Sequence, residues 1–177
     1  MQRLLVSLIA ALVPALVLAA PYTDARLGVR FNVPPGWRVQ PETLRGERVL
    51  RVIPPKADQR ERAAIDVSVR VGRVGRKDTL ERFARRLSQP AGEREAARWV
   101  RLDDKVGRLG ALYREGHFVD NHLWIVRNTL MVALQVDRTR AEARCSATAA
   151  EYKTWRRPLE SVCWSLEFVA KPRSTSR

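Results

Sequence analysis

The two histidines of the chain, His117 and His122, lie on either side of Asp120. Two imidazoles and a carboxylate together can bind a divalent transition metal. On a straight strand the two histidines would point to opposite faces, whereas a turn at Asp120-Asn121 would bring them back together. We interpret this segment as the polar tip of a hairpin, and we predict no metal and no cofactor.

A hydrolytic triad would need one of these histidines beside a nucleophile and an orienting carboxylate. The chain contains no Gly-x-Ser-x-Gly elbow, which presents a serine for such reactions. Residues 73–77 (Arg-Val-Gly-Arg-Lys) precede a predicted helix and could hold an anion, but they lack the Gly-Lys-Ser/Thr ending of a nucleotide-binding loop. The charge of Asp78, the predicted helix cap, would also oppose an anion. We therefore expect no enzymatic activity, and a hydrolase is the least favoured alternative.

Basic residues outnumber acidic ones by 33 to 19, giving a formal net charge of +14, and arginine supplies 28 of the 33. A charge of this size attracts polyanions without selecting a sequence. We therefore expect no specific recognition of nucleic acid, and we consider anionic lipid head groups or polysaccharides as alternative ligands. The candidate anion contacts are arginines of two predicted helices, Arg82, Arg85, Arg86, Arg156 and Arg157.

The first residues have the pattern of an export signal. Arg3 gives a short positive head, and Leu4 to Leu18 contain no charged residue. We expect cleavage after Ala19, because cleavage one residue later would put Pro21 directly after the bond. The uncharged run is shorter than the roughly 20 residues of a membrane-spanning helix, and no cysteine follows for a lipid anchor. Residues 1–19 are therefore predicted to be a cleaved signal peptide, with an uncleaved anchor as the alternative, and the mature protein is predicted to be periplasmic or secreted.

Residues 20–170 are predicted to form a single domain, followed by a basic, flexible tail over 171–177. Alternation and apolar runs predict strands over 27–33, 37–39, 48–53, 65–71, 97–102, 109–118, 122–127 and 129–136. The link at 127–129 predicts a hairpin, and the apolar runs on either side of it imply cover on both faces of the sheet. The expected fold is α+β, with an antiparallel sheet of about six to seven strands flanked by helices on its faces.

Two helices are predicted from the spacing of apolar residues. The first covers 80–87, with Asp78 and Glu81 as a capping box. The second begins after Thr148 and Glu151, which form another candidate capping box, and Pro158 is expected to kink or split it. Residues 165–169 are expected to return to an extended conformation.

The cysteines and tryptophans suggest further contacts. Cys145 and Cys163 are the only cysteines, and in an oxidising compartment such a pair favours a disulfide over two separate buried thiols. Trp37 follows a turn and is the candidate contact for a partner protein. The other tryptophans lie in apolar patterns and are predicted to be core residues: Trp99, Trp124, Trp155 and Trp164.

Near the start of the predicted mature domain, residues 28–37 read Gly-Val-Arg-Phe-Asn-Val-Pro-Pro-Gly-Trp. This is an extended segment that ends in Pro-x-Gly-Trp. A meander follows, and an aromatic helix leads into Ser-Leu-Glu-Phe at 165–168. This order, over about residues 24–169, resembles the PsbP/DcrB-like fold family of photosystem accessory proteins, bacterial envelope proteins and a Ran-binding import factor. The resemblance implies an antiparallel sheet between helices and a binding or assembly role, with no shared catalytic motif. We therefore expect an exported, non-enzymatic envelope protein that binds another protein or assembly.

Overall fold

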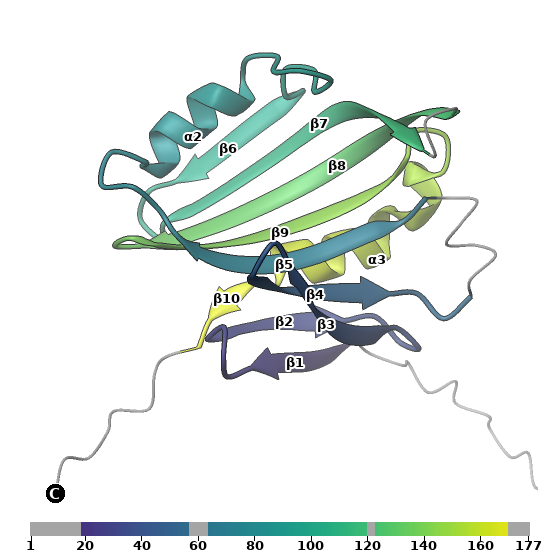
Figure 1. Cartoon of the computed structure of the whole chain (residues 1–177), viewed down its shortest axis with the longest axis horizontal. Helices are drawn as coiled ribbons and strands as arrows, with labels where there is room; N and C mark the ends of the chain where they lie inside the picture. The colour runs from purple at the N-terminus through teal and green to yellow at the C-terminus, as the bar shows by residue number, and fades with distance from the viewer. Residues whose placement is uncertain (1–18, 57–63, 120–122, 170–177) are drawn as a thin grey trace, which may run out of the picture.

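The computed structural model describes residues 19–56, 64–119 and 123–169, and a large antiparallel sheet forms the centre of the molecule (Figure 1). The strands of this sheet are β3 (Arg38–Leu44), β4 (Glu47–Ile53), β5 (Asp66–Arg73), β6 (Trp99–Asp103), β7 (Arg108–Val119), β8 (Leu123–Val136) and β9 (Thr139–Thr148). They lie in the order β3-β4-β5-β9-β8-β7-β6. The predicted α+β class and the predicted antiparallel sheet are confirmed.

Helices flank the large sheet on both faces (Figure 1). α2 (Leu80–Leu87) lies over β6 and β7 on one face, and α3 (Tyr152–Trp164) packs against β8 and β9 on the other. A small antiparallel sheet of β1 (Ala20–Asp24), β2 (Val29–Val33) and β10 (Glu167–Phe168) contacts α3 through β2. Within the described residues, no helix is long and apolar enough to cross a membrane.

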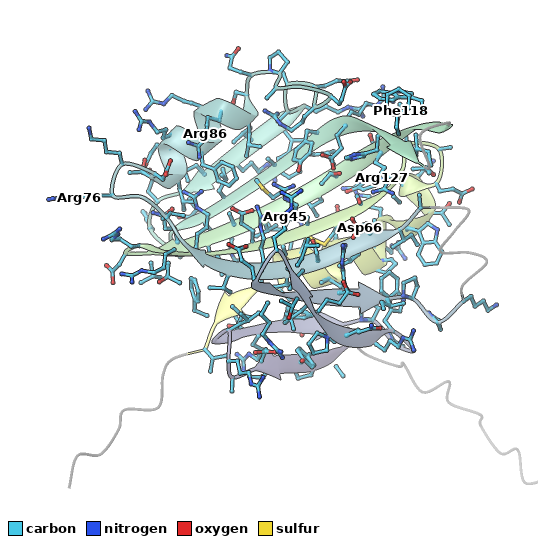
Figure 2. The ribbon with its side chains drawn as sticks, in the orientation of Figure 1. Arg45, Asp66, Arg76, Arg86, Phe118 and Arg127 are labelled. Carbon is cyan, nitrogen blue, oxygen red and sulfur yellow. A yellow bond between two sulfur atoms is a disulfide. The ribbon has the colours of Figure 1, made fainter. Side chains whose placement is uncertain are left out.

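Alternation along the strands divides the large sheet into two different faces. On β5, Val67 and Val69 belong to the core beneath α3, whereas Asp66 and Ser68 point to the α2 side. β8 carries apolar side chains on both faces only where both helices cover it. There Val132 faces the core beneath α3, and Met131 faces the core beneath α2. Beyond the reach of α2, the same face of the sheet carries polar side chains, and Figure 2 labels Asp66 and Arg127 on it.

The predicted hairpin at 127–129 is wrong, because β8 continues through these residues. Arg127 pairs in register with Glu115 on β7 and Thr148 on β9. The chain instead reverses after Val136, where Asp137 adopts a φ of 54° that aspartate tolerates better than most residues. β9, which follows this turn, was not predicted.

The details at the helix starts also differ from the prediction. The N-cap of α2 is Thr79, whose hydroxyl accepts a hydrogen bond from the Arg82 N–H, while Asp78 pairs with Arg86 instead. Glu151 makes no side-chain capping bond at the start of α3, so the second capping box does not form.

α3 continues through Pro158 without splitting. The turns on either side of this proline pack against the sheet, and this packing overrides the local preference of proline to end a helix.

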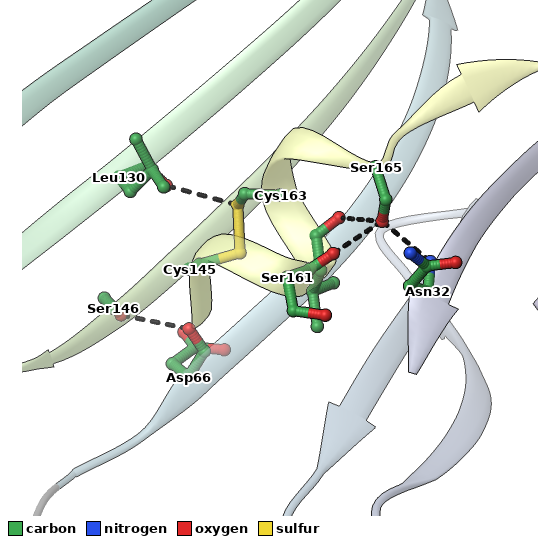
Figure 3. The surroundings of a disulfide bond; sticks show 9 residues. Asn32, Asp66, Leu130, Cys145, Ser146, Ser161, Cys163 and Ser165 are labelled. Atoms are coloured by element: carbon green, nitrogen blue, oxygen red, sulfur yellow. Dashed lines mark hydrogen bonds between the residues drawn. A yellow bond between two sulfur atoms is a disulfide. The ribbon is translucent and has the colours of Figure 1, made fainter. Parts of the chain in front are cut away.

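The predicted disulfide joins Cys145 on β9 to Cys163 on α3 (Figure 3). Both cysteines are buried in the core between the sheet and α3. Beside this bond, the Ser165 hydroxyl accepts a hydrogen bond of 2.7 Å from the Asn32 N–H of β2. The end of α3 is therefore attached both to the large sheet and to the small one.

Gly110 on β7 provides a test of the packing between the sheet and α3. An added Cβ would overlap the ring of Trp164, which stacks on Trp99 with ring centroids 6.1 Å apart. Gly110→Ala is therefore expected to lower the free energy of unfolding by about 1–3 kcal/mol, measured by urea denaturation. Gly72→Ala on β5 is the matched control, because its Cβ would meet no atom within 4 Å. Equal stability of the two variants would contradict this account of Trp164.

Candidate functional site

The open part of the α2 face contains two adjoining hollows, which we call the groove. The first, of about 750 Å³, lies beside α2, and the second, of about 520 Å³, lies beneath the β3–β4 turn. They share Glu115 of β7 and Arg144 of β9, so they form one continuous depression. Figure 2 shows Arg45 of the β3–β4 turn in front of the sheet, and this residue lines the second hollow together with Arg127.

The hollow beside α2 has a strong excess of positive charge. Its guanidinium groups are Arg82, Arg85, Arg86, Arg94 and Arg144, and its one carboxylate among the described lining residues is Glu115. Arg86 lies 3.0 Å from Asp78, and this bond holds the pKa of Asp78 below its usual value. Arg144 Nε lies 4.0 Å from Glu142 Oε2, and the other three arginines form no ion pair with a described carboxylate. The α2 end of the groove is therefore suited to an anion.

Arg94 also has a structural role in this hollow. Its guanidinium donates hydrogen bonds to the carbonyls of Arg86, Leu87 and Gln89, which lie at the end of α2. A cation there satisfies free carbonyls and interacts favourably with the helix dipole. The same group lies 5.5 Å from the centroid of the Tyr113 ring. Burial raises the pKa of Tyr113 to about 12, so this phenol remains neutral in the groove at physiological pH.

In the second hollow the charges are largely paired with one another. Arg51 bonds to Asp66 and Glu42, and Arg70 lies 2.6 Å from Glu142. These pairs give the β4 end of the groove mixed charge, to which Arg45 adds a cation without an ion pair among the described residues. The excess of positive charge is therefore larger at the α2 end, which favours the anionic end of a ligand there.

A second surface lies where β7 and β8 extend past their neighbouring strands. We call residues 117–119 and 123–125 the aromatic arm. Neighbouring segments stop before the arm on both sides. On the β7 side, the last described backbone hydrogen bond runs from the Gly116 N–H to the Glu93 carbonyl. On the β8 side, the pairing with β9 ends at Arg127. Phe118 and Trp124 face each other across the arm, with ring centroids 4.8 Å apart. They are 67% and 42% exposed, which leaves an aromatic pair on the surface.

Gly116 allows Trp124 to lie flat against β7, because any Cβ at this position would overlap the indole. The prediction that Trp124 is a core residue is wrong, since α3 and the neighbouring strands do not extend over the arm. The other predicted core tryptophans, Trp99, Trp155 and Trp164, are half-buried and pack against the core. Trp37 is also half-buried, and its ring meets Trp155 edge-on at 5.9 Å, so its predicted contact with a partner stays a prediction.

The structure does not bring the five predicted arginines together. Arg82, Arg85 and Arg86 lie on α2, whereas Arg156 and Arg157 lie on α3, on the opposite face of the sheet. The sequence analysis missed Arg94 and Arg144, which complete the cluster beside α2. The alternation of β9 could have indicated that Arg144 faces α2, had the strand been recognised.

The histidine cluster can be placed only in part. His117 points into the groove, and its Nε2 lies 3.7 Å from Glu115 Oε1. Asp120 and His122 lie outside the described residues, as do the predicted signal peptide up to residue 18 and the predicted tail at 171–177. Among the residues that the structure does describe, no three potential metal ligands come together.

The chain has a PsbP-like fold. It is similar to the cyanobacterial PsbP (CyanoP) of Synechocystis sp. PCC 6803, with 16% identity, a TM-score of 0.50 and coverage of 87% of this chain and 95% of the other. It is also similar to the Ran-binding protein Mog1p of Saccharomyces cerevisiae, with 11% identity, a TM-score of 0.58 and coverage of 86% and 96%. Neither a family model nor a curated protein sequence matches this chain. The similarity therefore concerns the fold, as the sequence resemblance implied.

Proposed function

We propose that this protein is an exported, non-enzymatic accessory protein that binds another protein or assembly of the cell envelope. The observation that carries the proposal is the aromatic arm, which holds Phe118 and Trp124 on the surface in a fixed mutual geometry. Large aromatic side chains that remain exposed on a folded domain mark contact sites, because they contribute much of the binding energy of protein interfaces.

Two further observations support the proposal. Mog1p, which has a similar fold, is a Ran-binding protein, and binding is thus one role that this architecture serves. The disulfide between Cys145 and Cys163 is compatible with export, since such bonds persist in oxidising compartments. Fold similarity by itself does not determine function, so the aromatic arm remains the main argument.

The alternative function is binding to anionic lipid head groups or polysaccharides of the envelope. The exposed arginines on α2 favour it. Arg156 and Arg157 do not contribute to the same surface, because α3 lies on the opposite face. A salt-sensitive interaction that involves no protein would indicate this alternative.

Replacing both aromatic residues of the arm tests the proposed function. We expect Phe118→Ala/Trp124→Ala to weaken capture of an envelope protein on immobilised mature protein by about tenfold or more at high salt. The cross-strand pair contributes only about 0.2–1 kcal/mol to stability, so the variant is expected to remain folded. Captured proteins would be identified by mass spectrometry and their affinities measured by surface plasmon resonance.

Val106→Ala/Val136→Ala is the matched control, because these valines are 63% and 56% exposed and lie outside the arm. Loss of binding in the arm variant alone would support the proposal. Unchanged binding by the arm variant, or no protein retained by the wild type at high salt, would overturn it. Analytical ultracentrifugation would show whether the retained partner is a second copy of this chain.

A further inference from the structure

We propose that the groove binds an extended, acidic segment of a partner protein, with the acidic end of the segment beside α2. This inference rests on the proposed function only in taking the ligand to be a protein. His117 belongs both to the arm and to the lining of the groove. The Phe118–Trp124 pair does not line the groove, so this aromatic pair and the groove arginines can be tested separately.

The first argument is the charge that is only partly compensated at the α2 end. Arg85 interacts electrostatically with Glu81, one turn away on α2, but it forms no close ion pair with a described carboxylate. Arg144 Nε lies 4.0 Å from Glu142 Oε2, but that oxygen already accepts a bond of 2.6 Å from Arg70. Arg144 Nε is buried and has no hydrogen-bond partner among the described residues. The Arg144 side chain is nevertheless 42% exposed, so an incoming carboxylate could bind its other nitrogens and supply a closer charged partner than Glu142.

The second argument is the surroundings of these guanidinium groups. Phe83, Leu87 and Tyr113 give the hollow beside α2 an apolar lining. Charges at the edge of such a low-dielectric lining interact more strongly than charges that are fully solvated. A carboxylate held between Arg85 and Arg144 would therefore gain more here than on the open surface of α3.

The third argument is the size and direction of the groove. It crosses β7, β8, β9, β5 and β4, and four spacings between strands amount to about 19 Å. An extended peptide of about six residues spans this distance. A single phosphate or carboxylate would fill only a small part of it.

The recessed position of the groove favours a peptide over a membrane surface. Arg144 lies on β9, inside the sheet, and lines both hollows. Arg45, by contrast, lies on the turn in front of the sheet (Figure 2). A flat layer of lipid head groups would contact the rim arginines before it reached Arg144. The paired charges of Arg51 and Arg70 at the β4 end add no net attraction for a polyanion, but they offer hydrogen-bond partners to a peptide backbone.

The test uses a fluorescent polyglutamate peptide of about six residues, titrated with the mature protein in about 0.15 M salt, where long-range attraction is screened. We expect Arg85→Glu and Arg144→Gln each to raise the Kd by about tenfold. Arg157→Glu on α3 is the matched control for Arg85→Glu, because it makes the same charge change at an exposed helical arginine outside the groove. We expect it to raise the Kd by less than about twofold.

Equal weakening by Arg85→Glu and Arg157→Glu would overturn the inference, because it would assign binding to total charge. Absence of peptide binding by the wild type would overturn it as well. The inference would also be overturned if the protein bound phosphatidylglycerol vesicles more tightly than the peptide and Arg85→Glu weakened the binding to vesicles to the same extent. The arm variant Phe118→Ala/Trp124→Ala is expected to bind the peptide normally, so failure of the groove and failure of the proposed function give different results.

Discussion

Reduction of the Cys145–Cys163 disulfide is expected to lower the free energy of unfolding by about 3 kcal/mol. The two cysteines are 18 residues apart, and the bond restricts the unfolded chain by closing this loop. For a domain of this size, the loss corresponds to a fall in Tm of roughly 6 to 12 °C. The effect is large because the bond is the covalent link between α3 and the large sheet.

The measurement is urea denaturation with and without dithiothreitol, on the wild type and on Cys145→Ala/Cys163→Ala. The reductant is expected to destabilise the wild type and to leave the double variant unchanged, which separates the disulfide from other effects of the reagent. If the reduced wild type kept its stability, the packing of Leu159 and Val162 would be enough to hold α3. Such a result would also remove the disulfide as a reason to expect that the protein works in an oxidising compartment.

Most of the large sheet could be predicted because its strands alternate clearly. On β5, Val67 and Val69 differ sharply in hydropathy from Asp66 and Ser68, and burial follows the same pattern. β9 also alternates in sequence, but its side chains that face the α3 core are mostly alanines, which have a weak preference for strands. The hairpin predicted at 127–129 failed because Arg127 and Asn128 were interpreted as a turn, although they pair on both sides within the sheet.

The candidate site could be predicted only in part, because it depends on which surfaces are covered. Trp124 lies in an apolar run, and nothing in that run indicates that β8 extends past its cover. Likewise, the sequence places Arg85 and Arg157 in two similar basic helices, whereas the sheet separates them. Local patterns predict which residues alternate, but the tertiary arrangement decides which faces meet.

Asp24→Asn is expected to lower the free energy of unfolding by about 2–3 kcal/mol at neutral pH. The Asp24 carboxylate is 4% exposed, and it accepts hydrogen bonds of 2.8 Å from Arg48 Nη2 and 2.9 Å from the Leu27 N–H. It connects β1 to β4 and therefore joins the small sheet to the large one. The amide retains an acceptor, but it leaves the guanidinium of Arg48 without its charged partner.

The same carboxylate predicts how stability depends on pH. Burial acts to raise the pKa of Asp24, but the hydrogen bonds from Arg48 and Leu27 and the charge of Arg48 outweigh it, and the pKa lies below its usual value. Because the folded pKa is lower than the unfolded value of about 3.9, the carboxylate stabilises the fold above that pH. Its contribution is lost as the pH falls through the folded pKa.

Urea denaturation at a series of pH values between 7 and 2 would measure this effect as the difference between the wild type and Asp24→Asn. The difference is expected to be largest near neutral pH and to shrink toward zero in acid. Asp104→Asn, at an exposed turn residue after β6, is the control and is expected to change stability by less than about 0.5 kcal/mol at any pH. A difference between wild type and Asp24→Asn that stayed constant down to pH 2 would mean that the shape of the side chain, and not its charge, holds β1 to β4.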